Sequence, residues 1–171
     1  AVGGFPSRGI YFLQGGGLVQ RCYVGVAPDG TTASPNGTGI SIYQAPNTSV
    51  GGTRANGNLV SGNVYTGIYI DMSPGCSVLG NYIGTDRTGD VALPNTGYGV
   101  EILNDCTGTR VGSANTGEGN VISGNSKDGI SLFGGKGVTI KGNKVGPNKA
   151  GTASMGNGAA GISADLAPNT T

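Results

Sequence analysis

The sequence predicts an all-β fold: a right-handed parallel β-helix, or solenoid, of about six coils with about three short strands each, in which tight coils alternate with loop-bearing coils. Three observations predict it: an internal repeat, short strands of one recurring pattern, and abundant Gly and Asn between them. The chain has 171 residues, of which 36 are Gly. A fixed period in such a chain indicates stacked supersecondary units. We therefore expect a single β-helix domain over residues 1–171.

The repeat has a period of 62 residues and consists of two unequal coils. A shift by this period pairs Gly57 with Gly119 and Asn81 with Asn143. Asparagines that recur at one corner are spaced alternately by 39 and 23 residues after the first coil. The longer spacing predicts a loop-bearing coil, and the shorter spacing predicts a tight one.

The first strand family has the pattern glycine, apolar, any residue, apolar. Since side chains alternate between the two faces of a strand, both apolar residues lie on one buried face. Its six members are residues 9–12, 39–42, 67–70, 99–102, 129–132 and 161–164. A second family is centred on Val24, Val60, Ile83, Ile122 and Val145, and a third on Val19, Val50, Val78, Val111 and Ile140. The right hand is expected because parallel crossovers are almost always right-handed.

One corner carries a column of asparagines just before the second strand family. Stacked asparagine side chains can hydrogen-bond to the backbone and to one another, and Asn and Gly tolerate the left-handed conformation that a tight corner requires. The predicted asparagine ladder consists of Asn58, Asn81, Asn120 and Asn143. Cys22 takes the equivalent position in the first coil, where we expect a buried thiol.

Composition and charge disfavour several classes of function. The net charge is +1 with basic residues scattered singly, which argues against nucleic-acid partners. No apolar run approaches the roughly 18 residues of a membrane span, so we expect no membrane insertion. The chain has no His, which removes the commonest general base and metal ligand. We expect no cofactor, no metal site and no enzymatic activity.

Any chemistry would fall to carboxylates, and Asp71 and Glu101 form the best pair. They lie on successive coils, offset by two residues, so a separation of roughly 8 Å is expected, which would suit an inverting hydrolase. No third carboxylate supports them, and we interpret both as solvated residues on an outward face. Asp86 and Asp90 could ligate calcium. Their sister loops lack carboxylates at these positions, which favours a solvated turn.

The outward column of the first strand family has mixed polarity. Its tyrosines could bind a sugar, although an ordinary solvent-facing surface is the simpler interpretation. The column consists of Tyr11, Ser41, Tyr69, Glu101, Ser131 and Ser163.

The sequence offers two kinds of covalent modification. Cys76 and Cys106 both sit in the corner before the third strand family, one coil apart, where stacked Cα atoms approach the roughly 5.5 Å that a disulfide prefers. We therefore predict a disulfide between Cys76 and Cys106. Glycosylation sequons occur at Asn36, Asn47 and Asn169.

Three segments carry a resemblance to a known superfamily. Residues 80–89 read GNYIGTDRTG, residues 92–102 read ALPNTGYGVEI and residues 119–125 read GNVISGN. They resemble the repeats of right-handed parallel β-helix proteins of the pectate-lyase-like superfamily, particularly the long repetitive surface proteins of bacteria and archaea. The resemblance implies a secreted protein, extracellular or on the cell surface. It indicates the fold rather than the activity, since this architecture carries lyases, glycosidases, adhesins and scaffolds alike.

The two ends of the chain, placed together, rebuild an internal corner. Residues 45–52 read APNTSVGG, residues 167–171 read APNTT and residues 1–4 read AVGG. Uncapped coil ends expose strand edges, and a head-to-tail contact that does not close gives an open filament. We therefore predict a non-catalytic subunit that assembles head to tail with itself into an extracellular filament or surface fibre. The expected interface residues are Val2, Ile10, Phe12, Ile162, Ala164, Leu166 and Thr171.

Three alternatives stay open. The chain opens with Ala1 rather than Met, which suggests a removed leader or a segment excised from a larger surface protein or adhesin. The superfamily resemblance also leaves a carbohydrate-active enzyme, either a polysaccharide lyase or a hydrolase. The third alternative is a module that binds glycans without cleaving them.

Overall fold

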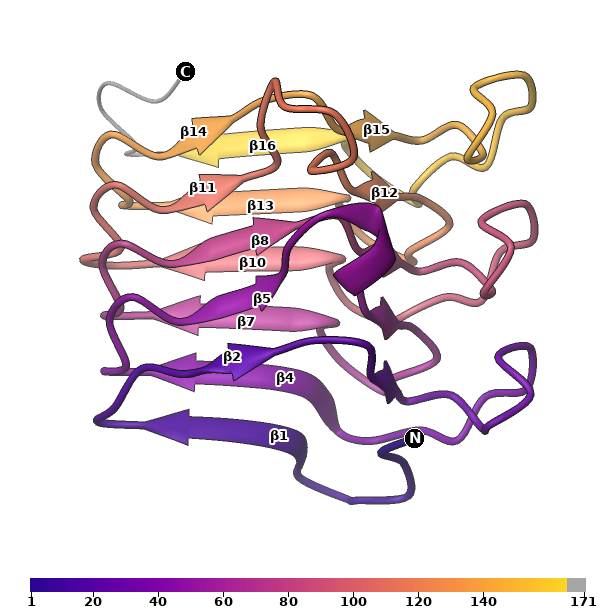
Figure 1. Cartoon of the computed structure of the whole chain (residues 1–171), viewed down its shortest axis with the longest axis horizontal. Helices are drawn as coiled ribbons and strands as arrows, with labels where there is room; N and C mark the ends of the chain where they lie inside the picture. The colour runs from indigo at the N-terminus through magenta and orange to yellow at the C-terminus, as the bar shows by residue number, and fades with distance from the viewer. Residues whose placement is uncertain (166–171) are drawn as a thin grey trace.

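Glycine and asparagine at the corners let the chain turn after every short strand, and in the computed structural model these strands stack into three parallel sheets (Figure 1). The structure describes residues 1–165. The interface residues Leu166 and Thr171 and the sequon at Asn169 therefore lie outside the described residues.

The longest sheet has six strands, which are the first strand family. Its strands, in sheet order, are β1 (Arg8–Leu13), β4 (Thr38–Tyr43), β7 (Ile68–Asp71), β10 (Val100–Leu103), β13 (Ile130–Phe133) and β16 (Ile162–Asp165). Every neighbouring pair is parallel. The register aligns the first apolar residue of each strand in one column, formed by Ile10, Ile40, Ile68, Val100, Ile130 and Ile162. The predicted strand family and its register are confirmed.

Each of the other two sheets has five strands within residues 1–165. The second sheet contains β2 (Leu18–Val19), β5 (Ser49–Gly51), β8 (Ser77–Leu79), β11 (Arg110–Val111) and β14 (Thr139–Ile140). The third contains β3 (Tyr23–Val24), β6 (Leu59–Val60), β9 (Tyr82–Ile83), β12 (Val121–Ile122) and β15 (Lys144–Val145). A single turn of 3₁₀ helix, η1 (Arg54–Asn56), interrupts the corner between β5 and β6. The predicted parallel β-helix is therefore confirmed.

The core is the space that the three sheets enclose. Apolar side chains from every sheet point into it, and in the central coils Ile40, Ile83 and Ile122 are fully buried. The inward columns stay apolar towards both ends of the stack: Ile10 and Phe12 are partly buried against the core at the N-terminal end, and Ile140 and Val145 at the C-terminal end. No helix among residues 1–165 has the length and hydropathy needed to cross a membrane.

The asparagine column forms a continuous hydrogen-bonded ladder between the second and third sheets. The backbone N–H and the Nδ2 of Asn58 both donate to Oδ1 of Asn81, at 2.9 and 3.0 Å. Asn81 makes the same two bonds to Asn120, and Asn120 makes them to Asn143. The backbone N–H of Cys22 donates to Oδ1 of Asn58 at 2.9 Å, and its thiol is half-buried. Cysteine thus removes one side-chain link but leaves the backbone bond.

A second asparagine ladder, which the sequence reasoning missed, lies between the third sheet and the longest sheet. Asn63 donates from its backbone N–H and its Nδ2 to Oδ1 of Asn95, at 3.1 and 2.8 Å. The ladder members, in coil order, are Asn36, Asn63, Asn95, Asn125 and Asn157. The 62-residue period relates Asn63 to Asn125 and Asn95 to Asn157. This repetition is the sequence signal that could have revealed the second ladder.

Val2 lies in a different sheet from the one that the comparison of the chain ends implies. It forms a parallel bridge with Val24, and its N–H donates to the carbonyl of Tyr23 at 2.7 Å. Val2 therefore extends the third sheet, whereas Val50 belongs to the second. The rebuilt corner was a wrong interpretation, because a Val-Gly pair occurs at both corners and a match this short cannot separate them.

Three loops project from one side of the stack, one above another (Figure 1). Each follows a strand of the third sheet and closes with a single antiparallel bridge. The bridges are Val26 with Ala33, Thr85 with Ala92, and Pro147 with Ser154. The loops touch through their backbones, since the N–H of Arg87 donates to Gly30 O at 2.9 Å and that of Lys149 donates to Gly89 O at 2.8 Å. The three loops therefore form a stacked layer beside the sheets.

Replacing Asn95 by Ala should lower the free energy of unfolding by about 2 to 4 kcal/mol, because it leaves two buried donors of Asn63 without their acceptor. Urea denaturation measures the change. Asn115→Ala is the matched control, since this asparagine is exposed and outside both ladders. Equal losses in the two variants would contradict a structural role for the second ladder.

Candidate functional site

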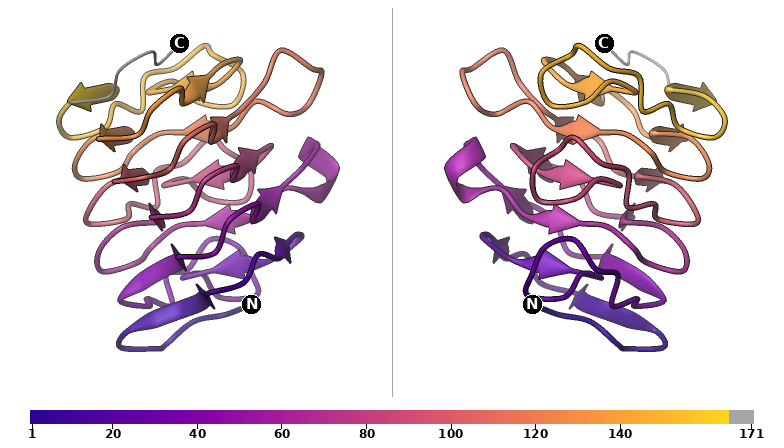
Figure 2. Two further views of the ribbon diagram at one scale, coloured as in Figure 1. Left: turned by 90° about the vertical axis from the view of Figure 1, so that its left-hand side faces the viewer. Right: turned by 90° about the vertical axis from the view of Figure 1, so that its right-hand side faces the viewer.

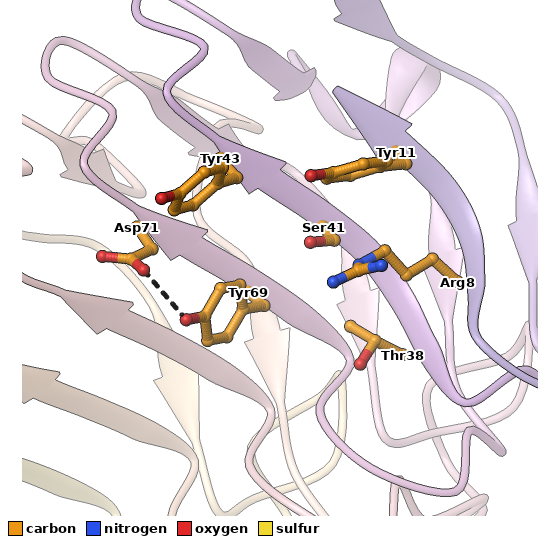
Figure 3. A pocket seen from close by; sticks show the side chains of 7 residues that line it. All are labelled: Arg8, Tyr11, Thr38, Ser41, Tyr43, Tyr69 and Asp71. Carbon is orange, nitrogen blue, oxygen red and sulfur yellow. Dashed lines mark hydrogen bonds between the residues drawn. The ribbon is translucent and has the colours of Figure 1, made fainter. Parts of the chain in front are cut away.

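The outer face of the longest sheet carries a groove at its N-terminal end, with a volume of about 350 Å³ (Figure 3). Strands β1, β4 and β7 supply its walls. The lining residues are Arg8, Tyr11, Thr38, Ser41, Tyr43, Tyr69 and Asp71. Aromatic rings, hydroxyl groups, one cation and one carboxylate therefore meet on one surface.

Strand register explains why these side chains share the groove. Tyr11, Ser41 and Tyr69 occupy one position on successive strands, and the alternation of the strand points them away from the core. Tyr43 and Asp71 occupy the next outward position. This second outward column exists because β4 and β7 continue beyond the four-residue pattern read from the sequence. The column holds Leu13, Tyr43, Asp71, Leu103, Phe133 and Asp165.

Contacts within the groove hold its charged groups in place. The guanidinium of Arg8 lies 4.5 Å from the ring centroid of Tyr11, the distance of a cation–π contact. The hydroxyl of Tyr69 donates to Oδ2 of Asp71 at 3.1 Å (Figure 3), and Nδ2 of Asn104 donates to Oδ1 at 2.6 Å. Asp71 is only 7% exposed, so the interpretation of this residue as solvated is wrong. Both of its carboxylate oxygens are already engaged by the protein.

Glu101 follows Tyr69 in the outward column and lies just outside the groove. Its Oε2 accepts a hydrogen bond from the hydroxyl of Thr66 at 2.9 Å. Burial raises the pKa of Glu101, and the charge of Asp71 adds to the increase, against the lowering effects of Thr66 and Lys127. Burial and the hydrogen bond to Asp71 likewise raise the pKa of Tyr69 to about 12. The structure thus places Asp71 and Glu101 in one neighbourhood, two residues out of register.

Asp86 organises its loop through hydrogen bonds. Its Oδ1 accepts backbone N–H groups from Gly89 at 3.0 Å and Val91 at 3.2 Å, as well as the Thr88 hydroxyl at 2.7 Å. Although burial raises the pKa of Asp86, these bonds together lower it. Oδ1 of Asp90 accepts Nδ2 of Asn148 at 3.1 Å. Donors that converge on a carboxylate oxygen occupy the position a cation would need, and residues 1–165 contain no cluster of metal-binding side chains.

The predicted disulfide between Cys76 and Cys106 is not formed, and both residues are buried free thiols. The strand register gives the reason. Ser77 pairs with Arg110, so Cys76 is level with Thr109, and Cys106 lies three residues earlier in its corner. The equal stacking that the prediction assumed is therefore wrong. Burial raises the pKa of both thiols, that of Cys106 to about 11, which makes them poor nucleophiles.

The two described sequons differ in accessibility. Asn36 has no exposed surface, and its Nδ2 donates to Asn63 Oδ1 and to the carbonyl of Val2. The prediction of a glycan at Asn36 is therefore wrong, because the side chain is a rung of the second ladder. Asn47 is exposed, at a corner where its backbone has a φ of 59°. Its glycosylation stays a prediction.

The predicted interface residues that the structure describes lie at both ends of the stack. Val2, Ile10 and Phe12 belong to the first coil, whereas Ile162 and Ala164 belong to the last strand of the longest sheet. Ile162 is 48% exposed, although its column is buried in the central coils. Each end of the stack therefore presents apolar side chains that are the last members of the inward columns.

Together these features define a parallel β-solenoid with an aromatic groove on its longest sheet. Residues 7–167 match the family described as "Right handed beta helix region", and the chain belongs to that family. The predicted superfamily resemblance is consistent with this match. Comparison with curated proteins and with solved structures finds no match.

Glu101→Gln should stabilise the protein at pH 7 but not at pH 3. The folded state raises the pKa of Glu101, so the ionised form weakens the wild type as pH rises through the raised pKa. Urea denaturation at both pH values measures the difference. Glu118→Gln is the control of opposite sign, because bonds from Ser113 and Asn115 lower the pKa of Glu118. A wild type that gains stability over Glu101→Gln between pH 3 and 7 would contradict the prediction.

Proposed function

We propose that this chain is a non-catalytic structural β-solenoid of an extracellular filament or surface fibre, in which end coils stack on those of a second copy. One observation carries the proposal: β1 and β16 are the two edge strands of the longest sheet and lie at opposite ends of the stack. Each has one hydrogen-bonded neighbour strand among residues 1–165. An open edge pairs readily with another strand.

The two edges are complementary in pattern. Continuing the register places β1 of one copy on β16 of the next, with Ile10 over Ile162 and the large ring of Phe12 over the small Ala164. This contact joins two different surfaces with the strands still parallel, so it does not close on itself and extends the solenoid. A second copy also covers Ile162, the large apolar side chain left half-exposed at the C-terminal end.

The proposed location is extracellular. It is supported by the resemblance to secreted β-helix proteins, because the family match agrees with that resemblance. The absence of catalysis is proposed because the carboxylate of Asp71, the one in the groove, is already engaged. Both oxygens of Asp71 accept bonds from Tyr69 and Asn104, so this residue is poorly placed to activate water or take up a proton.

A second candidate function is glycan binding in the aromatic groove. The specific observation that favours it is the meeting of Tyr11, Tyr43 and Tyr69 with Arg8 and Asp71 around one hollow of about 350 Å³. Binding sites combine apolar surface with a few fixed polar groups, and this groove has both. The filament and the groove are compatible, since stacking involves strand edges while the groove opens on the sheet face.

The first test of the proposal is the oligomeric state of the intact chain. Sedimentation velocity and electron microscopy should show linear oligomers that lengthen with concentration. They should persist at high salt, because salt screens charge contacts and leaves strand pairing and apolar burial. Ile162→Lys should reduce them to monomers or short oligomers. Val91→Lys, which makes the same charge change at an exposed loop residue, should not. A wild type that stays monomeric at every concentration would sink the filament proposal.

A panel of oligosaccharides tests the groove and the absence of catalysis together. Calorimetry should detect saturable binding of at least one glycan, and Tyr11→Ala or Tyr43→Ala should weaken it. Tyr65→Ala is the control, because this tyrosine is exposed and outside the groove. No new reducing ends or unsaturated products should appear. Cleavage that disappears in Asp71→Asn or Glu101→Gln would identify an enzyme instead.

A further inference from the structure

A second hollow of about 350 Å³ lies away from the longest sheet, at the corner between the second and third sheets. Two segments project there from the same side of the stack, η1 and the stretch 113–119 (Figure 2). The lining includes three cations, Arg54, Lys144 and Lys149, and no carboxylate. The remaining lining residues are Ser113, Ala114, Asn115, Gly117, Gly119, Asn120 and Gly142.

Arg54 is held rigidly at the base of this basic pocket. Its Nη1 donates to the carbonyls of Gly80 and Asn81, both at 3.0 Å, and its Nη2 donates to Gly119 O at 2.6 Å. The guanidinium also lies 4.5 Å from the ring centroid of Tyr82. Three of the five guanidinium N–H groups are thereby used, and the others remain for a ligand. None of these partners carries a negative charge.

The two lysines come from different parts of the chain. Lys144 belongs to β15, and its Nζ donates to the backbone carbonyl of Lys149. Lys149 lies in the third projecting loop, with its Nζ 6.0 Å from the Tyr82 ring centroid on which Arg54 also packs. Stacking of coils and loops therefore gathers three positive charges that are separated by up to 95 positions in the sequence.

Nearby carboxylates do not neutralise the pocket by direct bonds. Oε2 of Glu118 accepts the hydroxyl of Ser113 and Nδ2 of Asn115, and its pKa is lowered by those bonds. The carboxylate of Asp90 accepts Nδ2 of Asn148. Burial lowers the pKa of Arg54, so the folded protein carries this charge at some cost that an anion would offset.

We propose that the basic pocket binds one oxyanion group of an acidic glycan, a sulfate ester or a carboxylate. A guanidinium fixed by backbone carbonyls and two lysine ammonium groups are the donors that recognise such an oxyanion. The hollow lies at the small end of the range for ligand sites, which suits one charged sugar. Positive charge is concentrated here while the net charge of the chain is only +1, and a nucleic acid would need a longer basic surface. The site is independent of the filament proposal and of the aromatic groove.

The test is titration of the intact chain with four probes at equal ionic strength: inorganic sulfate, a sulfated disaccharide, a uronic-acid disaccharide and an uncharged disaccharide. Amide chemical shifts map the site, and calorimetry gives the affinity. At least one acidic disaccharide should bind about tenfold more tightly than both the uncharged sugar and free sulfate, with shifts at Gly117, Gly119 and Gly142.

Lys144→Gln and Lys149→Gln should each weaken that binding by about three- to tenfold without changing the melting temperature, because both side chains are exposed. Lys136→Gln removes the same charge at an exposed site outside the pocket and should bind like the wild type. Equal weakening in all three variants, or no saturable binding, would overturn the proposal. Sulfate that binds as tightly as the acidic disaccharides would overturn the assignment to a glycan.

Discussion

The structure depends on satisfying the hydrogen-bonding groups of its buried corners. Coils this small bury the backbone where the chain turns, and a buried amide without a partner is costly. Two asparagine ladders meet this requirement. In each ladder an Oδ1 accepts two donors from the preceding coil, as Asn81 does from Asn58, while Nδ2 donates to a strand carbonyl such as Val50 O. The ladders thereby fix the distance and register between coils, and the short strands of all three sheets inherit that register.

With the corners fixed, variation is confined to insertions and outward positions. The tight coils consist of strands and short corners, whereas the loop-bearing coils add the three stacked loops and η1. Arg54 shows how an insertion becomes part of the framework, because its guanidinium caps carbonyls of two later coils. The molecule therefore separates its surfaces: the strand edges lie at the ends, the aromatic groove on the longest sheet and the basic pocket at one corner.

Sequence reasoning found the corner residues that directly adjoin an apolar strand and missed those that do not. The first ladder was predictable because its asparagines directly precede apolar strands. The second escaped because its members do not share one sequence context. Asn63 and Asn125 follow a strand directly, whereas Asn36, Asn95 and Asn157 follow a projecting loop, which gives irregular spacings of 27, 32, 30 and 32 residues. The same irregularity misled the interpretation of Asn36 as a glycan site. The pairing of Cys76 with Cys106 failed because the two cysteines occupy different places in their corners: Cys76 immediately precedes β8, whereas Cys106 lies four residues before the equivalent residue of β11, Arg110.

The sequence by itself determined the fold, the three strand families and the inward columns. A two-residue alternation inside a fixed period leaves one way to bury the apolar residues, so local pattern and global register agree. Only the tertiary structure decided which outward residues meet. Tyr43 lies beside Asp71 on the next strand, and Arg54 and Lys149 line one pocket although they are 95 positions apart in the sequence. Such contacts depend on which strands and loops lie side by side, and that is set by packing between segments distant in the chain.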